Sequence, residues 1–119
     1  MTLTSGRHYE AIARSYLERR GLITHEAGYR CRLGELDLIC EERGVLVIVE
    51  VKARRSTSPV SAAESVDRFK QRRIIAATRH FLMTHPRWHE WPLRFDVLAI
   101  SAIETDPQID WITHAFVAD

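Results

Sequence analysis

Four charged residues stand in two segments that otherwise carry core side chains. Glu35 and Asp37 are two residues apart, as are Glu50 and Lys52 at the end of an apolar run that begins at Val45. A run that is β-branched and apolar at nearly every position predicts a strand buried on both faces. A carboxylate in such a strand is costly to desolvate unless a cation or a hydrogen-bond donor meets it. Chemistry is therefore the favoured explanation for these four residues.

A two-residue turn at positions 43–44 predicts an antiparallel hairpin in which Glu42 pairs with Val45. In that register Asp37 faces Glu50. Two carboxylates opposed at a Cβ separation of about 4.5–5.5 Å repel each other and destabilise the hairpin. A divalent cation between them would reverse that effect.

The same register places Glu35 opposite Lys52, on the face that carries Asp37 and Glu50. Mg²⁺ takes oxygen ligands from one or two carboxylates and keeps sites for water and substrate phosphates. An adjacent lysine stabilises negative charge that develops on a phosphate. The four residues therefore suit metal-assisted hydrolysis of a phosphodiester. The alternative is an ordinary Glu35–Lys52 ion pair, with Asp37 as a turn residue.

The segment 52–79 is strongly basic, although the whole chain has a net charge of only +1. It holds eight cations and two anions. A basic segment beside an acidic centre suits a polyanion that is held by cations and cut by a metal. A solvated basic helix is the alternative. The cations are Lys52, Arg54, Arg55, Arg68, Lys70, Arg72, Arg73 and Arg79.

Helical periodicity sorts the later members of this basic segment. Arg68, Arg72 and Arg79 cluster on one side and are expected to face solvent or a phosphate backbone. Lys70 lies on the opposite, apolar side and Gln71 lies between the two, so these residues are the candidates for pointing toward the sheet. The apolar side consists of Val66, Phe69, Ile74, Ala76, Ala77 and Phe81.

The chain is expected to form one domain, residues 1–119, in the element order αβββαββ. Its 119 residues, 45% of them hydrophobic, suffice for a real core. Glu10 lies at the edge of the apolar stripe of the first helix, where it either faces the sheet or acts as a first-turn acid. The expected elements are a helix over 6–20 that stops at Gly21, strands over 22–32, 36–42 and 45–53, a helix from Glu64 or Ser65 to Thr84, and strands over 93–101 and 110–117.

Membrane insertion and export are not indicated. The sequence has no run of about 18 apolar residues and no apolar stretch typical of a signal peptide. A cytoplasmic location is the resulting expectation. Cys31 and Cys40 are too few and too poorly spaced for a zinc site or a disulfide framework, so both are expected to be reduced packing thiols.

Several further polar and aromatic residues have ordinary structural explanations. Trp88 and Trp91 either stack on exposed bases or pack on the core of the domain. Arg94 and Asp96 share one strand face and are expected to form a structural ion pair. Zinc is not favoured, because a proline breaks the helix that would align the nearby histidines. These are His80, His85 and His89.

The motifs of this chain resemble those of the YraN-like bacterial family nearly from end to end. That family is similar in turn to the PD-(D/E)XK nuclease superfamily, and most closely to archaeal Holliday-junction resolvases. The resemblance implies a restriction-endonuclease-like three-layer α/β fold, with a central mixed β-sheet flanked by helices. The motifs are Gly34-Glu35-Leu36-Asp37-Leu38-Ile39, Val49-Glu50-Val51-Lys52, Lys70-Gln71-Arg72-Arg73-Ile74, Arg94-Phe95-Asp96-Val97 and His114-Ala115-Phe116.

The resemblance also implies roles for individual residues. Asp37 and Glu50 correspond to metal ligands, and the carbonyl of Val51 corresponds to a further one. Lys52 corresponds to the charge that positions or activates water, and Glu10 to the acid of the first helix in resolvase-like members. The expected cofactor is Mg²⁺ or Mn²⁺.

The expected function is hydrolysis of phosphodiester bonds in DNA, more than in RNA, with branched or junction DNA as a candidate substrate. A two-fold junction would suit a homodimer. One alternative is a non-catalytic nucleic-acid-binding protein that keeps the fold, and another is a structural protein whose acidic centre is an ion-pair network. The expected nucleic-acid-binding residues are Arg54, Arg55, Arg68, Lys70, Gln71, Arg72 and Arg73.

Overall fold

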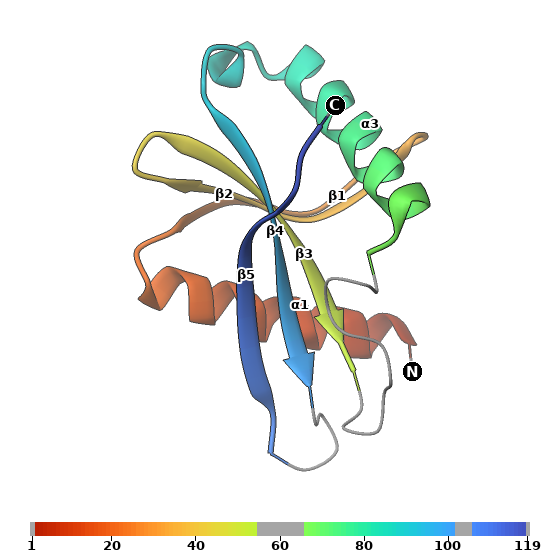
Figure 1. Ribbon diagram of the computed structural model, residues 1–119, viewed down its shortest axis with the longest axis vertical. Helices are drawn as coiled ribbons and strands as arrows, with labels where there is room; N and C mark the ends of the chain where they lie inside the picture. The colour runs from red at the N-terminus through yellow and green to blue at the C-terminus, as the bar shows by residue number, and fades with distance from the viewer. Residues whose placement is uncertain (1, 55–65, 102–105, 119) are drawn as a thin grey trace.

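The computed structural model describes residues 2–54, 66–101 and 106–118, with side chains from residue 7 onward (Figure 1). Within these ranges the order αβββαββ is confirmed, with one added 3₁₀ turn. The first helix begins at Thr2, earlier than expected, whereas the strand 93–101 has the expected bounds. The elements are α1 (Thr2–Arg19), β1 (Ile23–Cys31), β2 (Gly34–Glu42), β3 (Val45–Ala53), α3 (Arg68–Thr84), η1 (Pro86–Trp88), β4 (Leu93–Ser101) and β5 (Gln108–Phe116).

The strands form one mixed sheet in the order β1-β2-β3-β4-β5. β3 and β4 are parallel, and the other neighbours are antiparallel. The β2–β3 hairpin has the predicted register, with Glu42 opposite Val45. Its turn residues Arg43 and Gly44 have positive φ values of 49° and 83°. Positive φ at both central residues is typical of a type I′ turn, whose twist matches that of the flanking strands.

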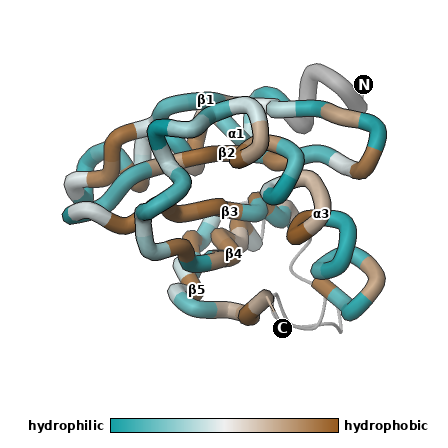
Figure 2. Tube along the Cα trace, turned by 90° about the horizontal axis from the view of Figure 1, so that it is seen from above, coloured by the Kyte–Doolittle hydropathy of each residue, from teal (hydrophilic) through white to brown (hydrophobic). Residues whose placement is uncertain are grey.

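The sheet is covered by one helix on each face, which gives three layers (Figure 1). Along β3, Ile48 belongs to the core that includes α3, whereas Val47 and Val49 belong to the core that includes α1. Burial on both faces explains why this strand is apolar at nearly every position. Figure 2 shows the hydrophobic positions along the central strands. The restriction-endonuclease-like three-layer architecture is thus confirmed.

Helix α1 ends in a Schellman motif. The N–H of Gly21, which has a φ of 96°, donates to the carbonyl of Glu18 at 3.1 Å, and the N–H of Leu22 donates to the carbonyl of Leu17 at 3.1 Å. Leu17 and Leu22 are both buried in the core under α1. This end therefore fixes α1 on the sheet and sets the direction in which its other side chains point.

Helix α3 begins at Arg68, so the predicted start at Glu64 or Ser65 is wrong; those two residues lie outside the described ranges. The helix is capped by Asp67, whose carboxylate accepts a hydrogen bond from the N–H of Lys70 at 2.9 Å. An aspartate in this position satisfies a backbone donor that the first helical turn leaves without a partner.

Phe69 does not belong to the buried side of α3, contrary to the prediction. Its side chain is 65% exposed, whereas Ile74 and Phe81 are buried. Phe69 precedes Ile74 by five residues, which turns the two side chains about 140° apart on a helix of 3.6 residues per turn. The apolar side predicted for α3 was therefore too wide, because it included Phe69.

The aromatic and ionic pairs of the C-terminal half are structural. Trp88 is 4% exposed and contacts Trp91 edge to face at 4.6 Å between ring centroids, so the core-packing alternative is correct. Asp96 is fully buried. It accepts hydrogen bonds from Arg94 Nε at 3.0 Å and from Trp111 Nε1 at 2.9 Å, which confirms the expected ion pair on β4.

Candidate metal centre

Asp37 lies where the hairpin strands β2 and β3 separate. In the described ladder, pairing ends at Leu38 and Val49. Two residues further along β3, the N–H of Val51 donates to Oδ2 of Asp37 at 2.8 Å. The N–H of Val51 has no backbone partner on β2 at this point and binds the Asp37 carboxylate instead. This contact fixes the orientation of the carboxylate. Asp37 is a strand residue, and the alternative of a turn residue is wrong.

Asp37 and Glu50 are neighbouring, partly buried carboxyl groups. Burial, followed by the neighbouring Asp37, raises the pKa of Glu50 to about 8. Burial also raises the pKa of Asp37, although the hydrogen bond from Val51 and the neighbouring Glu50 act in the opposite direction. Near neutral pH the pair therefore retains a proton when no cation is bound.

The ammonium group of Lys52 lies 3.7 Å from Oε2 of Glu50. The Lys52 and Glu50 side chains are only 19% and 17% exposed. Burial and the neighbouring Lys70 lower the pKa of Lys52, while Glu50 opposes this effect. The amine is therefore held beside the acidic pair in a partly desolvated position, where its charge acts more strongly than in water.

Glu35 does not face Lys52 as predicted. It pairs with Arg30 of β1, whose Nε lies 3.7 Å from Oε2 of Glu35. The register counted from the hairpin turn does not extend that far, because the described β2–β3 pairing ends at Leu38. The alternative of an ordinary Glu35–Lys52 ion pair is wrong for the same reason.

Glu10 reaches the acidic centre from α1. Because α1 begins at Thr2, Glu10 lies in the helix interior, and the alternative of a first-turn acid is wrong. Oxygen atoms of Glu10, Glu35 and Asp37 lie within 4.8 Å of one another. Burial raises the pKa of Glu10, and the charges of Asp37 and Glu35 raise it further.

Two small cavities adjoin these carboxylates. One, of about 180 Å³, is next to α1, and the other, of about 170 Å³, is next to α3. A water molecule or a phosphate oxygen therefore has room beside the acidic centre on both sides of the sheet. The first cavity is lined by Tyr9, Glu10, Asp37, Val51 and Ala53, and the second by Glu35, Glu50, Lys70, Arg73 and Ile74.

The donor set fits a divalent cation such as Mg²⁺ or Mn²⁺. Such hard ions take carboxylate, carbonyl and water oxygens. Burial, followed by the charges of neighbouring carboxylates, raises the pKa values of Glu10, Asp37 and Glu50, and a bound cation would favour their ionised forms. Within the described ranges, the one group of three or more histidine, cysteine or acidic side chains with the spacing of a metal site is Glu10, Glu35 and Asp37, and the predicted ligand Glu50 is not part of it. That group contains no histidine, which disfavours zinc.

The predicted nucleic-acid-binding residues divide between two sides of α3. Lys70 and Arg73 line the cavity beside Glu50. Gln71 turns away from this centre, because its Nε2 donates to the carbonyl of Val66 at 3.0 Å and its side chain lines a different cavity. Gln71, which was expected to point toward the sheet together with Lys70, therefore does not line the cavity beside Glu50.

The remaining predicted cations lie elsewhere. Arg68 and Arg72 are exposed beside the same cavity as Gln71, as expected for residues that face solvent. Arg54 donates its backbone N–H to Ile100 at 2.7 Å at the end of β3, and its Nε and Nη1 are buried with no hydrogen-bond partner among the described residues. Arg55 lies outside the described residues.

Comparison with known proteins places these residues in a family. The model of the Uncharacterised protein family UPF0102 matches residues 9–100. The chain belongs to this family. It is 44% identical to a UPF0102 protein of Stutzerimonas stutzeri over 95% of this chain and 94% of that protein. For UPF0102 proteins of Saccharophagus degradans and Alcanivorax borkumensis the identities are 43% and 42%, over 94% and 97% of this chain and 92% and 93% of the relatives.

Family membership in UPF0102 confirms the resemblance to the YraN-like group that the motifs indicated. The match of residues 9–100 spans every carboxylate of the candidate centre, from Glu10 to Glu50. It also spans the basic side chains of α3. Among the described residues of this UPF0102 chain, no helix is long and apolar enough to cross a membrane.

One site residue of this UPF0102 protein was not singled out from the sequence. A Cβ atom added to Gly34 would lie 2.9 Å from the backbone oxygen of Arg73. The missing side chain therefore lets α3 approach β2 closely, and this contact places Lys70 and Arg73 beside the acidic centre. The available signal was the glycine itself, since a glycine in a strand often marks close approach of another backbone.

The free thiols and the histidines play structural parts. Cys40 is buried, and burial raises the pKa of its thiol to about 11, so it stays protonated. His80 Nδ1 hydrogen bonds to the hydroxyl of Tyr29 at 2.6 Å. His85 stacks on Phe81 at 4.0 Å between ring centroids. These contacts agree with the expectation of packing groups.

Proposed function

We propose that this protein is a metal-dependent nuclease that hydrolyses phosphodiester bonds in DNA, with branched or junction DNA as the candidate substrate. The observation that carries the proposal is that Lys52, 3.7 Å from Glu50, interacts electrostatically with Asp37, which belongs with Glu10 and Glu35 to a carboxylate cluster that fits a divalent cation. Such a site offers negative ligands to the cation and a positive charge to a phosphate. The motif resemblance to PD-(D/E)XK nucleases supports the same chemistry.

The carboxylates would hold the cation in this proposal. Asp37, Glu50 and Glu10 supply oxygen ligands, and Val51 contributes by fixing Asp37 through its N–H. The bound cation would supply Lewis acidity and lower the pKa of a bound water. Because Asp37 is held by the backbone, its carboxylate is oriented before the cation arrives, which avoids an ordering cost at the moment of binding.

Lys52 would act on the scissile phosphate. Its ammonium group stabilises charge that develops on the phosphate oxygens during hydrolysis. Burial and Lys70 lower its pKa, so it gives up a proton more readily than an exposed lysine and can also assist in activating water. Lys70 and Arg73, which line the cavity beside Glu50, would bind the phosphates that flank the scissile one.

The test is cleavage of labelled four-way junction, single-stranded and duplex DNA in the presence of Mn²⁺ or Mg²⁺. Wild-type protein should cleave at least one substrate, and Asp37→Asn and Lys52→Met should each reduce the rate by on the order of 10²–10³, as for loss of a charge-stabilising group. Asp110→Asn is the matched control, because this exposed carboxylate lies on β5. Salt-sensitive DNA binding with no cleavage of any substrate would reject the nuclease proposal in favour of a non-catalytic binder.

A further inference from the structure

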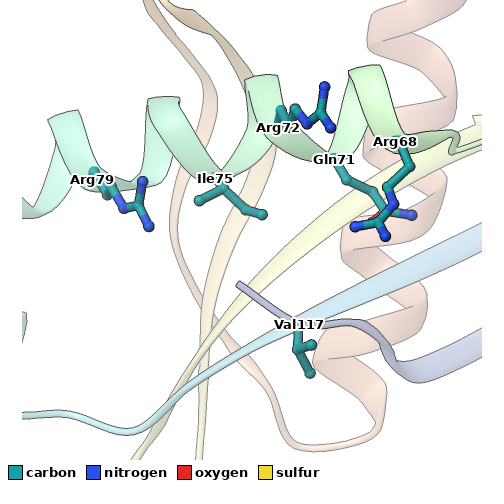
Figure 3. A pocket seen from close by; sticks show the side chains of 6 residues that line it. All are labelled: Arg68, Gln71, Arg72, Ile75, Arg79 and Val117. Carbon is teal, nitrogen blue, oxygen red and sulfur yellow. The ribbon is translucent and has the colours of Figure 1, made fainter. Parts of the chain in front are cut away.

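A larger cavity lies between α3 and the segment that follows β5. It has a volume of about 350 Å³. Figure 3 shows its side chains projecting from α3, with Val117 opposite them. We refer to it as the arginine cavity. Its lining consists of Arg68, Gln71, Arg72, Ile75, Arg79 and Val117.

The arginine cavity carries positive charge that no described residue offsets. Arg68, Arg72 and Arg79 are all exposed. Within residues 7–54, 66–101 and 106–118, none of the three guanidinium groups forms an ion pair or a hydrogen bond. Three such groups around one cavity favour an anion with several oxygen acceptors, and guanidinium groups match phosphate geometry well.

The arginine cavity and the acidic centre lie on different flanks of α3. Arg68 and Arg72 are each two residues from Lys70, which lines the cavity beside Glu50. Two residues correspond to a turn of about 160° on a helix of 3.6 residues per turn. Since a helix with its side chains is about 10–12 Å wide, anions bound on the two flanks are separated by about that distance or more.

We propose that the arginine cavity binds a backbone phosphate from a second segment of the nucleic acid, across α3 from the scissile phosphate. The proposal rests on the proposed function for the identity of the ligand. The apolar side chains of Ile75 and Val117 give the cavity a surface on which a sugar can pack. A strand that reaches both flanks must pass over α3, which favours long or branched substrates over short ones.

DNA binding measured without catalysis tests this site. Fluorescence anisotropy in EDTA uses single-stranded DNA of about 20 nucleotides, longer than typical site sizes of about 4–16. Replacing Arg72 and Arg79 together by Gln should weaken binding and reduce the slope of log K against log salt by about 0.7, because the loss of one phosphate contact removes about 0.7 for single strands. Arg19→Gln, exposed at the end of α1, should leave the slope unchanged.

A slope in the double variant that equals the wild-type slope would overturn the proposal. Calorimetric binding of AMP to the wild type that is lost in the double variant would also overturn it, because the cavity would then be a mononucleotide site. Absence of such AMP binding, together with the reduced slope, supports the backbone phosphate.

Different results reject the second phosphate site and the nuclease proposal. Asp37→Asn leaves the arginine cavity intact, so its salt slope should equal that of the wild type. A reduced slope in the double variant, without cleavage by the wild type, would reject the nuclease proposal and support the second phosphate site. Cleavage by the wild type with an unaltered slope in the double variant would reject only the second site.

Discussion

The N–H of Val51 donates a hydrogen bond of 2.8 Å to the carboxylate of Asp37, one residue beyond the last pair of the β2–β3 ladder. This relationship links the fold to the proposed chemistry. This contact orients Asp37, whose partly buried carboxyl group neighbours that of Glu50. Because the pKa of Glu50 is raised to about 8, the pair retains a proton near neutral pH, and a divalent cation would take the place of that proton.

Stability should fall with increasing pH because of this pair. The pKa of Glu50 is raised from 4.5 to about 8 in the folded chain, so the folded state binds more protons than the unfolded state between these values. By linkage, the free energy of unfolding then decreases as pH rises through this window, by at most about 1.4 kcal/mol per pH unit for one group. Below pH 4.5 the effect vanishes, because both states are protonated.

Urea unfolding of wild type and Glu50→Gln in EDTA, from pH 4 to pH 9, measures this dependence. The neutral amide cannot ionise, so the stability of the variant relative to the wild type should increase between pH 4.5 and pH 8. Added Mn²⁺ should counteract the loss in the wild type at high pH, because the ion binds the deprotonated form. Parallel pH curves for the two proteins would contradict the assigned pKa shift.

Gly34→Ala should move α3 away from the acidic centre. The new Cβ would lie 2.9 Å from the backbone oxygen of Arg73, a contact that the structure can relieve only by shifting the backbone. Overpacking of this kind costs about 1–3 kcal/mol. Thermal or urea unfolding measures the cost, and cleavage and DNA-binding assays measure the effect on the site.

Arg73→Ala is the control for that substitution. It removes the side chain of Arg73 but leaves the backbone oxygen in place, so it should weaken DNA binding with little loss of stability. If Gly34→Ala proved as stable as the wild type, the close approach of α3 to β2 would not be needed for the fold.

Phe69→Ala should change stability by less than about 0.5 kcal/mol, as expected for a surface substitution. The Phe69 side chain is 65% exposed at the start of α3. Phe81→Ala, at a buried position in the same helix, should cost about 3–5 kcal/mol. Urea unfolding compares the two variants directly. Equal losses would show that Phe69 is buried, as the helical pattern had predicted.

The sequence identified the hairpin and its acidic residues because both have local causes. The turn at Arg43-Gly44 sets the pairing of Glu42 with Val45, and two-residue periodicity then brings Asp37 close to Glu50. The same register wrongly placed Glu35 opposite Lys52. Strand pairing can end without any local signal in the sequence.

The features that the sequence did not reveal depend on how elements pack. Whether Glu10 faces the sheet depends on how α1 is docked, which the Schellman motif at Gly21 fixes. The need for a glycine at position 34 depends on the backbone of Arg73, which lies close to it in the fold although it is distant in the sequence. The exposure of Phe69 depends on how much of the first turn of α3 the sheet covers.

Calorimetric titration of Mn²⁺ into the metal-free wild type, Asp37→Asn and Asp110→Asn tests for the metal centre at Asp37 without requiring a choice of substrate. Asparagine retains an oxygen that can accept the hydrogen bond from Val51, so loss of binding would report the lost charge and not a lost structural contact. We expect saturable Mn²⁺ binding to the wild type and Asp110→Asn and none to Asp37→Asn over the same concentration range. Equal Mn²⁺ binding to all three proteins, or none to the wild type at millimolar concentration, would contradict the metal centre at Asp37.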